Sequence, residues 1–317
     1  MKVSAPGKVL WIGSYSVVFG GISHVIAIDK RVTCECAKAQ EMEFVTTFGK
    51  FSEGQNELID SVLETLRTSY DLPKMKVVLT NDDAFQIDGK KTGLGSSSAA
   101  TVALMGCVLG LINNSLDKDL VYRLSQKANY VRQRGIGSGF DIAAAVYGSV
   151  VYRRYRDINR VDSQLEPLRL PRRVKMLLGF TGRSANTVNL VKKFEEAKDN
   201  AEFKEIIHEI ELNNDMAIRL LKLGKIEAAI PHVRLSRNLL NLLSEGVVGV
   251  KLETEEDRRI MGLAERNGAI ISLMPGAGGG DLILSLGYEL ENVKRAWMKE
   301  GIKVIEVNED EGLRLEN

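Results

Sequence analysis

The segment Lys91-Thr-Gly-Leu-Gly-Ser-Ser-Ser98 decides how this chain is interpreted, because it runs directly into the apolar stretch from Ala99 to Ile112. Two glycines let a backbone approach an anion closely, and the first amides of the following helix point toward the same place. The segment therefore predicts a phosphate-binding turn at the start of a buried helix. It lacks the Gly-Lys-Ser/Thr ending of a Walker A loop and the spacing of a dinucleotide-binding turn. A glycine turn with a serine N-cap and no ligand is the simpler alternative.

Glycine-rich segments near both ends of the sequence accompany this turn. Ser4-Ala-Pro-Gly-Lys8 is followed by Gly13-Ser-Tyr-Ser-Val-Val-Phe-Gly20, and Pro275-Gly-Ala-Gly-Gly-Gly-Asp281 lies near the end. In this order and spacing the segments resemble the motifs of the GHMP kinases, a superfamily named after galactokinase, homoserine kinase, mevalonate kinase and phosphomevalonate kinase. A single glycine loop is a weak signal, whereas three in register are specific. The resemblance covers nearly the whole chain.

Within this superfamily the chain is most similar to the phosphomevalonate kinase branch. Lys91 stands two residues before the first glycine, and the segments Ile136-Gly-Ser-Gly-Phe-Asp141 and Thr181-Gly-Arg-Ser-Ala-Asn-Thr187 also resemble that branch. One departure is Ser98, which stands where alanine is usual. Another is Ser14-Tyr15, which stands where mevalonate kinases carry Glu-His, and this counts against mevalonate kinase.

The resemblance implies an α+β fold with two domains and an active site between them. Residues 1–166 are expected to form a ribosomal protein S5 domain 2-like ATP-binding domain, and residues 167–317 a ferredoxin-like domain. The length of 317 residues suits two domains, and Pro167 and Pro171 mark a candidate boundary. Strand-like segments mixed with helical periodicity, for example at Glu255 to Arg266, are compatible with this α+β class.

The resemblance implies transfer of the γ-phosphate of ATP to (R)-5-phosphomevalonate, which gives (R)-5-diphosphomevalonate in the mevalonate route to isoprenoids. ATP and Mg²⁺ are the implied cofactors, and the small-molecule acceptor is the implied partner. Mevalonate kinase and mevalonate-diphosphate decarboxylase are the nearest alternatives. A non-catalytic binding protein of the same fold is the alternative from another class, but such proteins tend to lose the loop serines, Lys8 or Asp141, and this chain keeps them.

The resemblance assigns Lys8 and Asp141 as the catalytic pair. Because the acceptor oxygen is already ionised, we expect Lys8 to stabilise the transferring phosphoryl group and Asp141 to hold Lys8 and the acceptor in line. The structural alternative for Asp141 is an N-cap on the helix that follows it. The residues expected to cradle the triphosphate are Gly93, Leu94, Gly95, Ser96, Ser97 and Ser98. One of these serines is expected to bind Mg²⁺. We take Ser97 as that ligand, and Ser96 and Ser98 are the alternatives.

A phosphorylated acceptor brings close to two negative charges, so its site needs cations beside the phosphate-binding turns. The residues expected on the acceptor side are Lys91, Ser138, Gly139, Arg183, Ser184, Asn186, Gly278 and Gly279. Further candidate cations are Arg132, Arg134, Arg153 and Arg154. A solvated surface role is the alternative for each of these further arginines.

The overall composition excludes several other classes of protein. Forty-three Lys and Arg against forty-two Asp and Glu give a formal charge of +1, so nothing attracts the whole chain to nucleic acid or to a membrane. Three cysteines without a CxxC pair predict no disulfide framework and a reducing compartment. The first residues show no signal peptide, and Ala99 to Ile112 is too short to span a bilayer, so we expect a cytoplasmic protein of undetermined oligomeric state.

Overall fold

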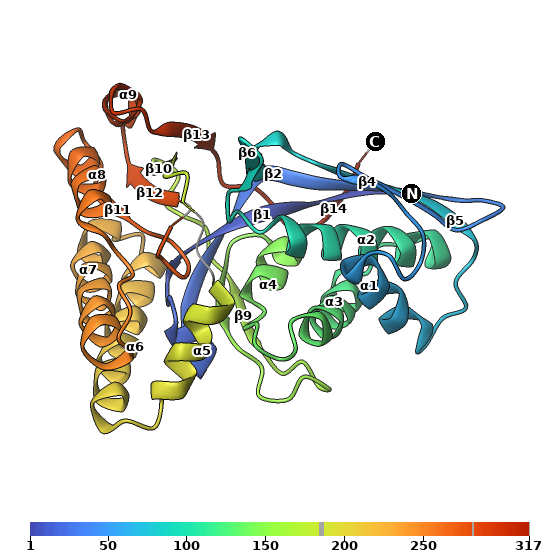
Figure 1. The fold of residues 1–317 in the computed structure, drawn as a ribbon, viewed down its shortest axis with the longest axis horizontal. Coiled ribbons are helices and arrows are strands. Elements are labelled where there is room, and N and C mark those ends of the chain that lie inside the picture. Colours follow the sequence, from blue (N-terminus) through green and yellow to red (C-terminus); the bar gives the residue numbers. More distant parts are fainter. Residues whose placement is uncertain (184–186, 281, 317) are drawn as a thin grey trace.

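Two long N-terminal strands form the frame of the larger sheet (Figure 1). The computed structural model describes residues 1–183, 187–280 and 282–316. Strands β1 (Lys2–Ile12) and β2 (Ser23–Lys38) pair antiparallel along most of their length, and the register shifts between Pro6 and Gly7 and again between Leu10 and Ile12. Both strands are rich in buried β-branched residues, which suit a pleated, half-buried surface.

The other strands of the larger sheet come from widely separated parts of the chain. The order is β14-β1-β2-β5-β3-β4, with β8 pairing with β2 and β9 with β8. Their bounds are β3 (Glu43–Thr46), β4 (Gly49–Phe51), β5 (Met75–Asn81), β8 (Val150–Arg153), β9 (Gln164–Pro167) and β14 (Arg314–Leu315). A short separate hairpin consists of β6 (Gln86–Ile87) and β7 (Lys90–Lys91), preceded by the turn η2 (Asp83–Phe85). The last strand, β14, returns the chain to the first one.

Helices cover one face of this sheet. They are α1 (Glu57–Arg67), α2 (Ser96–Asn113), α3 (Lys118–Arg132) and α4 (Phe140–Tyr147). Helix α2 lies at the centre, and every residue from Ser98 to Gly110 is buried. Among the described residues, α2 is the one helix long and apolar enough to cross a membrane by length and composition, but 72% of it is buried inside the protein. The expectation that this segment is too short was wrong, because the helix takes in the loop serines and has 18 residues, while its predicted role as a core helix is confirmed.

A smaller antiparallel sheet with order β11-β12-β10-β13 dominates the second half of the chain. Its strands are β10 (Lys175–Phe180), β11 (Ile271–Leu273), β12 (Leu282–Gly287) and β13 (Lys303–Val307). The helices of this half are α5 (Thr187–Ala197), α6 (Ala201–Lys222), α7 (Ile226–Leu243), α8 (Glu255–Arg266) and α9 (Glu291–Lys299), and η3 (Ser244–Val248) follows α7. In chain order the sheet reads second-third-first-fourth, and helices link the first strand to the second and the third to the fourth. This is the ferredoxin-like arrangement, so the expected α+β fold class is confirmed.

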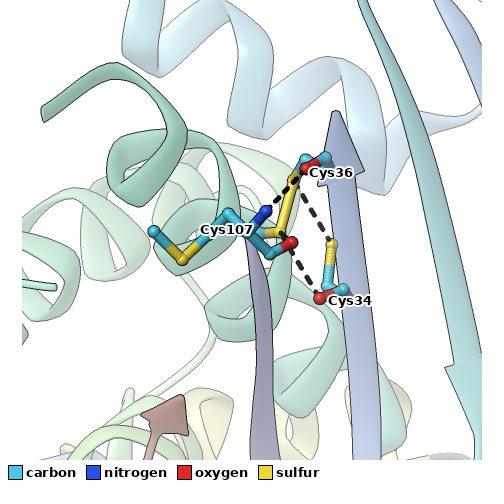
Figure 2. Close-up of a disulfide and its surroundings, with 4 residues drawn as sticks. Cys34, Cys36 and Cys107 are labelled. Atoms are coloured by element: carbon cyan, nitrogen blue, oxygen red, sulfur yellow. Dashed lines mark hydrogen bonds between the residues drawn. A yellow bond between two sulfur atoms is a disulfide. The ribbon is translucent and has the colours of Figure 1, made fainter. Parts of the chain in front are cut away.

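The structure corrects the expectation that the cysteines form no disulfide. Cys36 of β2 and Cys107 of α2 are joined as a disulfide, with Cys34 beside them (Figure 2). Their separation of 71 residues in sequence gives no hint of this pairing. The contact arises because α2 packs directly on β2.

A buried histidine of β2 connects β1 to the segment that follows β9. The indole Nε1–H of Trp11 donates to Nδ1 of His24 at 2.6 Å, and Nε2–H of His24 donates to the carbonyl of Leu168 at 2.8 Å. His24 is fully buried. Burial lowers the pKa of His24 to about 4, so its imidazole is neutral in the folded protein at neutral pH.

Because His24 is buried in its neutral form, we expect the folded protein to become less stable in mild acid. The unfolded chain takes up a proton on His24 below its ordinary pKa of about 6.5, whereas the folded chain does so only near its pKa of about 4. The contribution is therefore present above pH 6.5 and is lost as the pH falls from there toward 4. Between pH 7 and pH 5 the free energy of unfolding should fall by about 2 kcal/mol from this group alone.

Urea unfolding of the wild type and of His24→Gln at both pH values measures this term. His24→Gln should be less stable at pH 7 but should show a smaller drop toward pH 5. The exposed His208 provides the matched control, because His208→Gln should keep the wild-type drop. An equal drop in His24→Gln and the wild type would contradict the assignment.

Candidate active site

Lys8 is fastened to the glycine turn by its backbone and by its side chain. Its backbone N–H donates to the carbonyl of Leu94 at 2.8 Å, and its Nζ donates to the carbonyl of Gly93 at 3.0 Å. Gly95 follows with φ of +84° as the N-cap of α2, and a Cβ there would lie 2.9 Å from Cε of Lys8. Glycine is therefore required at this position both for the left-handed backbone and for the passage of the lysine.

Asp141 is held next to the start of the same helix. It lies in the first turn of α4, and its Oδ2 accepts a hydrogen bond of 2.5 Å from Oγ of Ser98, a residue of α2. The N-cap of α4 is Gly139, with φ of +83°, so the alternative that Asp141 serves as the cap is wrong. The Nε2–H of Gln126 donates to the carbonyl of Gly139 at 2.8 Å and fixes the turn. The starts of α2 and α4 are thus joined through a carboxylate.

Two cavities meet at this point. The first has a volume of about 770 Å³, and Ser96 and Ser97 line it. The second has a volume of about 580 Å³ and is lined by Lys8 and Asp141. Glu57 and Arg132 line both cavities, so they mark the place where the two adjoin. Each volume is within the usual range for a small-molecule site.

The first cavity combines several apolar side chains with the glycine turn that precedes α2. The apolar side chains that line it are Phe48, Leu58, Ile59, Leu79, Phe85 and Ala100. The serines at the N-terminus of α2 lie in the same cavity, where helix amides and the helix dipole favour an anion. A nucleotide has a flat, largely apolar base and an anionic chain of phosphates, and the cavity offers partners for both. The cavity therefore suits a nucleotide.

The second cavity is rich in cations. The basic residues that line it are Lys8, Arg132, Arg134 and Lys192. Ser138 contributes a hydroxyl, and Thr187 at the start of α5 adds a helix N-terminus to the same wall. These features suit a ligand with several negative charges and hydroxyl groups.

The floor of the second cavity joins the first and third glycine-rich segments. The hydroxyl of Ser14 donates to the carbonyl of Gly276, and the hydroxyl of Tyr15 donates to the carbonyl of Ala277 at 2.8 Å. The Tyr15 ring also stacks on Phe194 of α5, with ring centroids 3.8 Å apart. Burial raises the pKa of Tyr15, so the phenol stays protonated and keeps donating its hydrogen bond. Segments more than 250 residues apart in sequence thereby form one surface.

The first cavity also provides oxygen donors of the kind that Mg²⁺ prefers. Ser97 offers a hydroxyl and Glu57 a carboxylate, and both line the first cavity. The first-turn position of Glu57 in α1 is an ordinary one for an acid, because carboxylates favour helix N-termini. Nothing in its local sequence therefore distinguishes Glu57 from a structural residue.

Most of the predicted site residues lie together. Lys8, Asp141, Ser138 and Gly139 surround the second cavity or its adjoining turn, and the residues from Gly93 to Ser98 form the turn itself. Ser98, however, is buried and directs its hydroxyl to Asp141. The carbonyl of Leu94 is likewise engaged by Lys8. Lys91 lies on the wall of the first cavity, beside Ser96, and not in the second.

Several residues expected on the acceptor side lie elsewhere. In the described part of the chain, Arg183 lines neither cavity, and its guanidinium pairs with the buried carboxylate of Asp257 at the start of α8. Gly278 and Gly279 line neither cavity, and the N–H of Gly279 donates to the carbonyl of Leu252 at 2.7 Å. Ser184 and Asn186 lie outside the described residues. Sequence position alone could not separate Gly278 from Gly276, which does line the second cavity.

The further candidate arginines divide into two groups. Arg132 and Arg134 line the second cavity. Arg153 and Arg154 instead donate to backbone carbonyls, Arg153 to Gly20 and Arg154 to Val18 and Gly135. Residues not foreseen in the site are Glu57, Phe48, Tyr15, Thr187 and Lys192.

Comparisons with known proteins show the family to which the chain belongs. The model of the GHMP kinases N terminal domain matches residues 57–149. The solved structure of Streptococcus pneumoniae phosphomevalonate kinase in complex with phosphomevalonate and AMPPNP has a TM-score of 0.83 at 20% identity and covers 98% of this chain and 100% of that chain, which shows a shared fold. A mevalonate kinase of Thermococcus onnurineus is 24% identical over 99% of this chain and 97% of its own length. The phosphomevalonate kinase of Saccharolobus solfataricus is 52% identical over 100% of this chain and 99% of its own length. With a relative this similar along its whole length, the chain belongs to the GHMP kinases, in the phosphomevalonate kinase branch.

Proposed function

We propose that this protein transfers the γ-phosphoryl group of ATP to (R)-5-phosphomevalonate and releases ADP and (R)-5-diphosphomevalonate. The observation that carries the proposal is that a cavity lined by Ser96 and Ser97 adjoins a cation-lined cavity that contains Lys8 and Asp141, with Arg132 lining both. The 52% identical relative is named for this activity, which supports the choice of acceptor. The reaction consumes and yields small molecules, and no nucleic acid or membrane partner is proposed.

The triphosphate binds along the N-terminus of α2 in this proposal. Ser96 and Ser97 line the first cavity, and their hydroxyls and backbone amides are the hydrogen-bond donors that we propose for the phosphate oxygens. When Mg²⁺ is bound, it neutralises charge on the terminal phosphates, and Ser97 and Glu57 are the residues that would hold it. The base packs against the apolar side chains of the cavity, among them Phe48.

Lys8 and Asp141 position and stabilise the reacting groups. The acceptor phosphate oxygen is already ionised, so no base is needed to activate it. Lys8, fixed by the carbonyl of Gly93, offsets the charge on the phosphoryl group as it passes between the cavities. Asp141 remains an acceptor for the hydroxyl of Ser98 and orients Lys8 and the acceptor in line.

Arg132 lies where the charges of both substrates come closest. Its Nη2–H donates to Oδ1 of Asn129 at 2.7 Å, which fixes the end of the guanidinium. Its buried Nε has no hydrogen-bond partner among the described residues. Because Arg132 lines both cavities, its guanidinium can bind phosphate oxygens of the nucleotide and of the acceptor.

The remaining features of the proposal concern the whole protein. We propose that the enzyme is cytoplasmic. The division into an ATP-binding domain of residues 1–166 and a second domain of residues 167–317 stays a prediction. The cations in the second cavity favour a phosphorylated acceptor over mevalonate itself, and this distinguishes the proposal from mevalonate kinase activity.

An acceptor panel tests the function directly. We expect ADP release with ATP and 5-phosphomevalonate to exceed that with mevalonate by at least about 100-fold in kcat/KM, because the cations of the second cavity then meet a charged phosphate. Mevalonate 5-diphosphate, assayed for CO₂ release, serves as the third acceptor. Faster turnover of mevalonate, or CO₂ release from the diphosphate, would contradict the proposal.

Substitution of the catalytic pair tests the mechanism. Asp141→Ala should lower kcat by roughly 10²–10⁴, the usual range for a positioned catalytic group, and Lys8→Met should lower it at least as much. Steady-state kinetics with both substrates saturating give these values, and thermal melting shows whether the variants are folded. Lys299→Met, at an exposed position of α9, is the matched control and should keep wild-type turnover. Near-normal kcat in both site variants would remove the pair from the mechanism.

Arg132 provides a separate test of how charge is balanced between the cavities. Arg132→Ala should lower kcat/KM by about 10–100-fold, the range expected for one lost hydrogen bond to a charged group. Arg132→Lys should recover part of the loss, because it restores the charge without the planar fork. Arg160→Ala is the control, since the Arg160 side chain is 83% exposed and lies on the surface. Unchanged kcat/KM in Arg132→Ala would contradict the assigned role.

A further inference from the structure

A cluster of three buried cysteines lies beneath the helix that carries the phosphate-binding turn. Cys34 and Cys36 are two positions apart on β2, so their side chains leave the strand on the same face, toward α2. Cys107 of α2 faces them, and the three Sγ atoms lie within 4.8 Å of one another (Figure 2). Cys36 and Cys107 are bonded, while Cys34 keeps its thiol, with its Sγ 4.0 Å from that of Cys36.

We propose that this cluster is a redox-dependent lock, in which a disulfide to Cys107 fastens α2 to β2 and either Cys36 or Cys34 can supply the second sulfur. The lock is independent of the phosphoryl transfer proposed above. It acts on the helix whose first residues are Ser96 and Ser97, so it stabilises the frame on which the phosphate-binding turn is built.

Formation of the lock requires an external oxidant, and a small-molecule disulfide fulfils this need. The thiols of Cys36 and Cys107 and one external disulfide give the protein disulfide and two small-molecule thiols. Transfer within the cluster needs no oxidant. The thiolate of Cys34 attacks Sγ of Cys107, the bond between Cys36 and Cys107 breaks, and Cys36 leaves as a thiolate that takes the proton lost by Cys34.

The surroundings of Cys107 accommodate both redox states. Its Sγ lies 3.2 Å from the carbonyl oxygen of Met1 and 3.4 Å from that of Cys34. A reduced Cys107 thiol can donate to either carbonyl, so opening the disulfide leaves no polar group stranded. Buried thiols also pack as small apolar side chains. Reduction therefore removes the cross-link without emptying the core.

Burial keeps exchange slow in the folded protein. All three sulfurs lie in the core, and burial raises the pKa of the Cys34 thiol, so little of the reactive thiolate is present. Exchange then takes place during folding or local opening. After folding, the pairing persists.

The stabilising effect follows from the length of chain that the bond closes. The two bonded cysteines are 71 residues apart, and a cross-link over so long a loop restricts the unfolded chain strongly. Opening the disulfide should lower the melting temperature by roughly 5–10 °C. The larger sheet and α2 should show the greatest increase in amide exchange.

The test combines thiol counting with thermal melting. The wild type and three variants, Cys34→Ala, Cys36→Ala and Cys107→Ala, are refolded from denaturant in oxidised glutathione, unfolded again with an alkylating reagent, and weighed by mass spectrometry. We expect one alkylated thiol in the wild type and none in Cys34→Ala. Cys36→Ala should also show none, because Cys34 then pairs with Cys107. Cys107→Ala should show two.

Melting with and without reductant supplies the second measurement. Reductant should lower the melting temperature of the wild type, Cys34→Ala and Cys36→Ala, but should not change that of Cys107→Ala. Cys34→Ala is the matched control, because it loses one buried thiol and keeps the bond. Three alkylated thiols in the oxidised wild type, together with a melting temperature that reductant leaves unchanged, would overturn the lock even if a variant failed to fold. Two alkylated thiols in Cys36→Ala would overturn the exchange.

Discussion

The two hydrogen bonds from Lys8 to the glycine turn are the constraint on which the rest of the site depends. The backbone N–H of Lys8 binds Leu94, and its ammonium group binds Gly93, so strand β1 fixes the turn and the turn fixes the lysine. Gly95 then starts α2 in a left-handed conformation that leaves the lysine its path. Ser98, one turn further along, holds Asp141. One strand, one turn and two helix starts thereby become a single rigid unit, and such rigidity is what electrostatic catalysis requires.

The distribution of charge explains why the second cavity is lined by cations that are far apart in sequence. Two polyanions must approach each other, so positive charge has to be present at their meeting point and cannot be drawn from the protein as a whole, whose net charge is only +1. Arg132 and Lys8 supply it from different elements. Arg183, by contrast, is taken up by the buried carboxylate of Asp257, and its charge serves the start of α8. An arginine therefore lines a cavity in one place and forms a structural ion pair in another.

The parts of the structure that depend only on neighbouring residues, such as helix boundaries and glycine turns, could be predicted from the sequence. Helix α8 lies at the expected residues, because a regular apolar period and clear end signals define it. The glycine segments carry their own turn geometry, so the sequence placed Lys8 and Asp141 beside the turn, while their catalytic roles stay a prediction. Glu57 was not foreseen, because an acid in a first helical turn is common, and the pairing of Cys36 with Cys107 depends on how α2 packs on β2. Contacts of this kind are determined by the tertiary fold, and a single sequence carries no local sign of them.

The pairing of β14 with β1 brings the end of the described chain back to its beginning. Val3 lies opposite Leu315, and the guanidinium of Arg31 holds the carbonyl of Gly312 at 2.8 Å and the carboxylate of Asp310 at the same distance. At this edge of the sheet, the paired residues therefore lie at nearly opposite ends of the described sequence, and contacts of this kind form late in folding. During synthesis the other strands can assemble while the polypeptide is still attached to the ribosome, but this edge strand joins only after residue 315 has emerged. Until then one edge of β1 has unpaired backbone groups. A nascent chain that stalls late in translation would expose this edge to chaperones or to other chains.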